Sequence, residues 1–138
     1  MAKYNFSTPD MHVPKQVTSD TGMGRTKFLS DTIVELLQFR INAEEESSRI
    51  YLAASMCKYS NEELAHADKA RDYLLSFNIL PETRPIKEVN NYFEGLAEVI
   101  YATLDHEALI TQQCKDLAKA TLAEGDLLTF NLAQFYLT

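Results

Sequence analysis

Apolar residues recur every three or four positions along most of the chain after residue 30, which is the period of an amphipathic α-helix. The first helix is predicted to begin after Ser30, which can serve as its N-cap, and to run through Cys57. Its inward stripe is predicted to consist of Ile33, Leu37, Ile41, Glu44, Ser48, Tyr51 and Ser55. Glu44 therefore lies in the middle of an otherwise buried face.

A second helix is predicted over residues 60–77, with Ser60 and Glu63 forming a capping box at its start. Its inward stripe is predicted to consist of Tyr59, Glu63, His66, Ala70, Leu74 and Phe77. The stretch NILPETRPIKE follows, in which Pro81 and Pro85 exclude a helix interior and favour a long extended crossover.

A third helix is predicted over residues 88–121, and Glu107 interrupts its apolar stripe as Glu44 interrupts the first. That stripe is predicted to consist of Val89, Phe93, Leu96, Ile100, Thr103, Glu107, Ile110, Cys114 and Leu117. Gly125 ends the helical region, and a last helix is predicted to begin near Asp126. The pattern as a whole predicts an all-α four-helix bundle.

Composition agrees with one helical domain over residues 30–138, preceded by an arm over residues 1–29 that is extended or mobile. The arm holds prolines and glycines among scattered polar residues and is expected to carry no chemistry. The chain of 138 residues has only four glycines and four prolines, which suits one core built from long helices. A net charge of −7 argues against a nucleic-acid partner, because such proteins concentrate Lys and Arg.

The location predicted from the sequence is the cytoplasm. No apolar run has the length of a signal peptide core or a membrane span, so we expect neither secretion nor a membrane partner. Cys57 and Cys114 lie far apart and form no CxxC motif, and we expect both to be buried thiols in a reducing cytosol.

The carboxylates predicted to point inward are the candidate metal ligands. His66 follows Glu63 by three residues, about 60° round the helix, so four potential ligands from three stripes converge. Facing carboxylates need positive charge, and no Lys or Arg is expected on these stripes. Oxygen ligands with one imidazole suit iron or manganese, and a pair of metal ions is the predicted counter-charge.

A metal-free interpretation stays open beside this one. Each inward Glu could pair with a neighbouring Tyr or Ser, and His66 could be an ordinary core histidine. Tyr51 is either a core aromatic residue or a hydrogen-bonding neighbour of the site. The charges predicted to face solvent are Glu45, Glu46 and Glu62, with Glu45 and Arg49 forming an i,i+4 pair.

Three stretches resemble the helices of ferritins, most closely the bacterial non-haem type: INAEEESSRIYLAAS, YSNEELAHADKARDYLL and DHEALITQQCKDLAKATLAEGDLLTFNLAQFYLT. The resemblance covers residues 31–138 and implies a ferritin-like bundle with a long crossover between its second and third helices. It also implies a di-iron ferroxidase centre. The residues that match its ligands and neighbours are Glu44, Glu63, His66 and Glu107 as ligands, Tyr51 beside the centre, and Glu62 at an accessory iron site.

The function implied by the resemblance is iron storage. The resemblance implies that O2 oxidises Fe(II) at the di-iron centre and that Fe(III) moves into a homo-oligomeric cage of about two dozen subunits. Haem is not expected, because haem-binding relatives carry Met directly after the Glu of ExxH and Leu64 stands here. The alternatives are another di-iron oxidase or peroxidase, which typically needs a second ExxH or a cysteine-ligated iron, and a metal-free helical interaction module.

The predicted helix lengths conflict with a meeting of Glu44 and Glu63. If the first two helices join near Lys58, Glu44 lies about 14 residues, or roughly 21 Å, before the turn. Glu63 lies only about 5 residues, or roughly 8 Å, beyond it. The two carboxylates are then not level, and levelling them requires about 13 to 15 more residues between Cys57 and Tyr59.

The fourth helix has the same shortage. Glu107 lies about 14 residues before the end of the third helix, so its level partner is expected at about position 140, beyond Thr138. In ferritins a Glu-Gln pair follows this point, and a longer segment joins the first two helices. We therefore expect either that a loop and a fourth-helix tail are absent from this sequence or that the protein is truncated, with an incomplete fourth helix.

Overall fold

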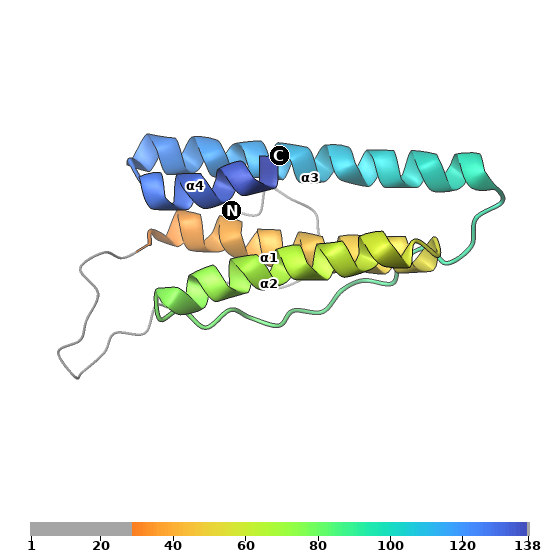
Figure 1. Cartoon of the computed structure of the whole chain (residues 1–138), viewed down its shortest axis with the longest axis horizontal. Helices are drawn as coiled ribbons and strands as arrows, with labels where there is room; N and C mark the ends of the chain where they lie inside the picture. The colour runs from red at the N-terminus through yellow and green to blue at the C-terminus, as the bar shows by residue number, and fades with distance from the viewer. Residues whose placement is uncertain (1–28, 138) are drawn as a thin grey trace.

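The computed structural model describes residues 29–137, which form four α-helices (Figure 1). The helices are α1 (Asp31–Ala53), α2 (Cys57–Ser76), α3 (Leu96–Glu124) and α4 (Leu127–Leu137). The predicted all-α four-helix bundle is therefore confirmed. The arm predicted over residues 1–29 lies outside the described residues except for Leu29, which is buried in the core.

Helix α1 begins where the sequence predicts and ends earlier. The Ser30 hydroxyl accepts a hydrogen bond from the backbone N–H of Ile33 at 3.2 Å, which satisfies one donor of the first turn. The predicted stripe is buried from Ile33 to Tyr51, whereas Ser55 is exposed. The prediction that this helix runs through Cys57 is wrong, because it ends at Ala53.

A short turn over residues 54–56 joins α1 to α2. Ser55 adopts a left-handed backbone with φ of 59°, which reverses the chain without Gly or Pro. Helix α2 therefore begins at Cys57, and the capping box predicted at Ser60 is wrong. The Ser60 hydroxyl lies inside the helix, buried, at 2.8 Å from the Ser48 hydroxyl of α1.

The predicted crossover is confirmed and is longer than expected. After α2 the chain runs back along the α1–α2 pair as an extended strap, coloured green to teal in Figure 1. Gln38 of α1 fixes it, since its side-chain amide donates to the Glu82 carbonyl oxygen at 3.0 Å. The Glu82 backbone N–H donates back to the Gln38 side-chain oxygen at 2.9 Å. This docking holds the strap against the buried face of α1.

Helix α3 begins at Leu96, so the helix predicted from residue 88 starts too early. The Asn90 side chain accepts a hydrogen bond from the backbone N–H of Tyr92 at 3.0 Å. Such local bonds compete with helix formation. Val89 and Phe93 line a pocket under the strap instead of continuing the α3 stripe, and Leu96 is 74% exposed.

Gly125 ends α3, as the sequence predicts, and adopts the left-handed conformation with φ of 71°. Helix α4 then turns back and lies beside the C-terminal part of α3 (Figure 1). Direct helix packing joins α1 to α2, α1 to α3 and α3 to α4. Among the described residues, none of the helices combines the length and apolar character needed to cross a membrane.

Three predictions, two about charged residues and one about a thiol, are corrected by the structure. Glu45 pairs with Arg71 of α2 at 2.6 Å rather than with Arg49. Glu46 is 5% exposed and lies 3.8 Å from the ammonium group of Lys87, so it does not face solvent as predicted. The two cysteines also differ. Cys57 is exposed, contrary to prediction, whereas Cys114 is buried as predicted and its burial raises the pKa of the thiol.

Candidate metal site

Three of the predicted ligands meet between α1 and α2. The Nδ1 atom of His66 lies 3.4 Å from Oε2 of Glu44 and 3.5 Å from Oε2 of Glu63. One potential ligand atom from each residue lies within 4.8 Å of the other two. This spacing allows a single cation to contact two carboxylates and one imidazole.

The early end of α1 explains why these residues meet. Glu44 lies nine residues before the end of α1 and His66 nine residues beyond the start of α2, so these two residues are level, and Glu63 lies one helical turn nearer to the connection. The prediction that Glu44 and Glu63 do not meet is therefore wrong for this structure, because it placed the turn near Lys58. The serine contact between residues 48 and 60 lies on the same α1–α2 interface and fixes this register.

Arg40 supplies a counter-charge that the sequence argument did not anticipate. Its side chain is fully buried one turn before Glu44, and its Nη2 donates to Oε1 of that carboxylate. Its Nη1 donates to the side-chain oxygen of Gln113 in α3 at 2.6 Å. The prediction that no inward Lys or Arg lies on these stripes is wrong, although position 40 falls on the α1 stripe at helical spacing from Leu37 and Glu44.

The second oxygen of Glu44 has a different environment. Oε2 is buried and forms no hydrogen bond within the described residues. An ionised carboxylate oxygen left in this state is costly unless a cation or donor reaches it. The atom faces the imidazole of His66, which itself faces Glu63. Two carboxylates and one imidazole form a donor set that suits iron or manganese.

Glu107 lies outside this cluster and has a protein partner of its own. The Tyr51 hydroxyl donates a hydrogen bond to Oε1 of Glu107, joining α1 to α3. Burial, together with the bond to this carboxylate, raises the pKa of Tyr51 above its ordinary value, so Tyr51 stays protonated. Tyr51 is therefore a hydrogen-bonding neighbour of a predicted ligand, and Glu107 is not within the three-residue group.

Glu62 lies outside the cluster as well. It precedes Glu63 in α2 and is exposed, as the sequence predicts for a solvent-facing charge. Its proposed role at an accessory iron site stays a prediction.

His106 is a second residue that sequence reasoning missed. Its Nε2 lies 2.5 Å from the Ser47 hydroxyl of α1, and burial lowers the pKa of the imidazole. Nearby Glu46 and Glu107 oppose that shift. A signal for it exists in the sequence, because His106 directly precedes Glu107, but it lies off the predicted α3 stripe.

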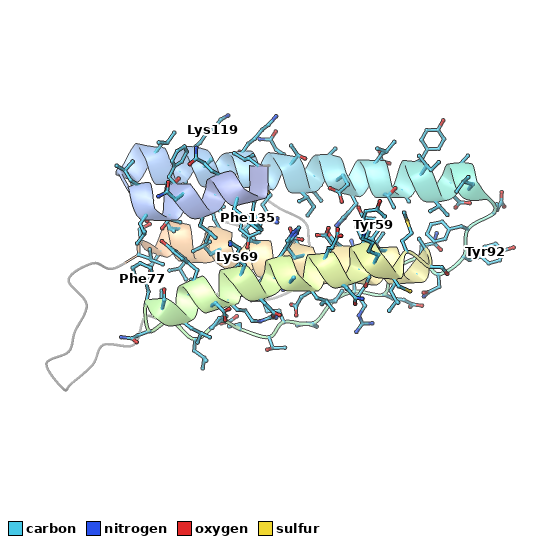
Figure 2. All side chains as sticks on the ribbon, in the orientation of Figure 1. Tyr59, Lys69, Phe77, Tyr92, Lys119 and Phe135 are labelled. Carbon is cyan, nitrogen blue, oxygen red and sulfur yellow. The ribbon has the colours of Figure 1, made fainter. Side chains whose placement is uncertain are left out.

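Aromatic residues of α4 form one wall of the site. The imidazole of His66 makes edge-to-face contacts with the rings of Phe135 and Tyr136, whose centroids lie at 5.6 and 6.3 Å. The Tyr136 hydroxyl donates to the His66 carbonyl oxygen at 2.8 Å. Figure 2 shows Phe135 and Lys69 between α4 and α2, and the Lys69 ammonium lies 4.1 Å from the Phe135 ring centroid.

Fold and site together define a helical bundle with a carboxylate and histidine cluster between its helices. Residues 27–138 match the family model described as a ferritin-like domain. The chain belongs to this family, and the resemblance found in the sequence is confirmed at that level.

Named relatives agree with the family assignment. The chain is 31% identical to the bacterial non-heme ferritin of Campylobacter jejuni over 80% of this chain and 74% of that protein. It is 29% identical to the bacterial non-heme ferritin of Escherichia coli over 80% of this chain and 75% of that protein. An open pore ferritin from the archaeon Archaeoglobus fulgidus has the same fold, with a TM-score of 0.76, 24% identity, and coverage of 80% of this chain and 76% of that chain.

Proposed function

We propose that this protein binds Fe(II) at the cluster of Glu44, Glu63 and His66, oxidises it with O2, and stores the Fe(III) in a cage built from copies of the chain. The observation that carries the proposal is the buried Oε2 of Glu44, which has no hydrogen-bond partner among residues 29–137 and faces the imidazole of His66 within the group of three ligands. Membership of the ferritin-like family and relatives named bacterial non-heme ferritins support iron as the metal.

We propose the following roles for the predicted ligands, supported by the grouping of three of them between α1 and α2. Glu44 and His66 would act as terminal ligands, and Glu63 and Glu107 as ligands of which one bridges a pair of ions. Tyr51 orients Glu107 through its hydrogen bond, and Glu62 binds iron at an accessory site. Iron is the substrate, and these side chains bind it, orient it and keep it close to the protein interior.

The remaining parts of the proposal concern assembly and location. We propose a closed homo-oligomeric cage of about two dozen subunits, because stored Fe(III) requires an enclosed volume that one chain of this size cannot form. We also propose a cytoplasmic location, no haem and no nucleic-acid partner. The acidic net charge of −7 supports cations as the bound species.

The test is aerobic addition of Fe(II), with ferric absorbance followed in the near ultraviolet. The double variant Glu63→Gln/His66→Gln is expected to slow the initial oxidation by at least about tenfold, since two ligands are removed. Asp72→Asn, an exposed change on the same helix, is the control and should leave the rate unchanged. Equal rates in all three proteins would contradict the proposed site.

Size-exclusion chromatography of the same iron-loaded sample tests storage. We expect iron to elute with a particle far larger than a monomer or dimer. Oxidation at the wild-type rate with all iron in a monomer or dimer fraction would contradict the cage and leave the site standing.

A metal-free helical interaction module is the second candidate, because two protein pairs favour it. Glu44 accepts a hydrogen bond from Arg40, and Glu107 accepts one from Tyr51, so both carboxylates already have protein partners. Under this candidate Fe(II) neither binds nor raises the melting temperature, whereas specific binding to the native state raises it.

A further inference from the structure

Arg40 is the most completely enclosed charge beside the candidate metal site. Its side chain has no exposed surface, and its guanidinium contacts three helices. It donates to Glu44 on α1 and to Gln113 on α3, and its guanidinium carbon lies 4.5 Å from the Tyr136 ring centroid on α4. These contacts hold the positive charge in one place.

We propose that Arg40 is a positioning residue that makes the cluster of Glu44, Glu63 and His66 prefer divalent over trivalent cations. The proposal rests on the proposed function, because it concerns the same cluster. In that setting Arg40 makes the site hold Fe(II) more readily than the Fe(III) that oxidation produces. It thereby favours release of the product from the site.

The positioning part follows from the two oxygens of Glu44. Arg40 occupies Oε1, and Oε2 is the oxygen that faces Nδ1 of His66, at 3.4 Å. Glu44 therefore presents a single oxygen to a cation, and chelation by both oxygens requires breaking a buried ion pair. Gln113 holds the other arm of the guanidinium, which keeps Arg40 from turning away when an ion arrives.

The selectivity part follows from charge. Glu44 and Glu63 together carry two negative charges when ionised. Arg40 adds one positive charge, which lies at Oε1 of Glu44, on the side of this carboxylate away from the candidate cation position. Repulsion between a fixed charge and an ion grows in proportion to the charge of the ion. Arg40 therefore opposes a trivalent ion more than a divalent ion of similar size, and this difference remains in the protein interior, where salt screens weakly.

The experiment compares affinities for Zn(II) and Tb(III), which needs neither O2 nor turnover. In Arg40→Gln, the ratio of Tb(III) to Zn(II) affinity is expected to rise by about tenfold over wild type, as the removal of one nearby charge predicts. Arg49→Gln removes the same charge from an exposed position of the same helix and should change the ratio by less than about twofold. Circular dichroism spectra check that the variants fold.

A second variant tests the charge without removing Arg40. Gln113→Glu has nearly the same shape and keeps an oxygen for Arg40 Nη1. It loses no hydrogen bond within residues 29–137, because Gln113 Nε2 has no partner there. The new carboxylate neutralises part of the Arg40 charge, so the Tb(III) to Zn(II) ratio should rise in the same direction. Gln112→Glu, the exposed neighbouring position, is its control.

The outcomes separate the two proposals. If wild type binds both ions and the ratio is unchanged in Arg40→Gln or, should that variant not fold, in Gln113→Glu, the role of Arg40 is refuted and the metal site stands. A ratio that falls in either folded variant also refutes it. If wild type binds neither ion, both the site and the role of Arg40 are overturned.

Discussion

At Glu44 the two carboxylate oxygens have different surroundings, since Oε1 accepts a hydrogen bond from Arg40 and Oε2 has no hydrogen-bond partner among the described residues. A buried ionised carboxylate is tolerated when it is paired, and Arg40 supplies that pairing in the absence of metal. The second oxygen remains costly until a cation reaches it. The residue therefore serves both the stability of the bundle and the binding of a metal ion.

Tyr73 gives a pH-dependent prediction that does not involve the metal site. Burial raises the pKa of Tyr73, and its hydroxyl lies 2.7 Å from that of Thr129 across the α2–α4 contact. The unfolded chain releases this proton at a pH of about 10, while the folded chain retains it, so stability is lost as pH rises above about 10. Tyr73→Phe should therefore lose less unfolding free energy between pH 8 and pH 10.5 than wild type loses.

The measurement is urea unfolding at the two pH values, and the difference between them is the readout. Tyr73→Phe is also expected to be less stable than wild type at pH 8 by about 1 kcal/mol, because the Thr129 contact is lost. Tyr101→Phe, at a position 69% exposed, should show the wild-type pH dependence. If Tyr73→Phe and wild type lose the same unfolding free energy between pH 8 and pH 10.5, Tyr73 is not the source of the pH dependence.

Residue-level prediction from the sequence found the ligands and missed their partners. Glu44, Glu63 and His66 were predictable because polar groups interrupt apolar stripes of helical period. Arg40 lies on the same α1 stripe, but fully buried arginines are rare in proteins, so a sequence pattern alone favours a solvent-facing position for it. Its burial depends on Gln113, which comes from a distant helix and is invisible to a local pattern.

At the scale of the elements, the register of α1 against α2 decides whether the site exists. The start of α1 was predictable from its N-cap residue Ser30, whereas the capping signal at Ser60 misplaced the start of α2. The turn over residues 54–56 was not predictable, because it contains neither Gly nor Pro and uses a left-handed Ser55. The late start of α3 was also missed, because the apolar period continues through residues 89–95 while the side-chain bond at Asn90 and the extended Gly95 favour a non-helical backbone there.

Two glycines at the ends of α3 give a matched test of backbone conformation. Gly125 has φ of 71°, which penalises any residue with a Cβ, whereas Gly95 has the extended backbone that any residue adopts. A Cβ added at either position meets no atom within 4 Å, so sterics do not confuse the comparison. Gly125→Ala should lower the free energy of unfolding by about 1 kcal/mol, and Gly95→Ala should change it by less than about 0.5 kcal/mol.

Chemical denaturation of both variants provides the measurement. If both variants lose a similar free energy of unfolding, the left-handed conformation at Gly125 is not required for the turn between α3 and α4. That result would also remove the reason for the sharp return of α4 along α3.

At the scale of the whole molecule, the site is assembled by elements that are far apart in the sequence. Helix α1 supplies Glu44, α2 supplies Glu63 and His66, and α4 covers the imidazole with aromatic rings. The fold class and the crossover were predictable from helical period and proline positions. The meeting of the ligands was not, since it depends on where α1 ends and α2 begins and on the serine contact between them.

The measurement that tests the central claim most directly is anomalous diffraction from crystals soaked in ferrous salt without oxygen. Data collected on both sides of the iron absorption edge locate bound iron independently of any activity. We expect a peak bonded to Oε2 of Glu44, a carboxylate oxygen of Glu63 and Nδ1 of His66, with Arg40 still paired to Oε1 of Glu44. A map with no iron peak among these three side chains would contradict the account.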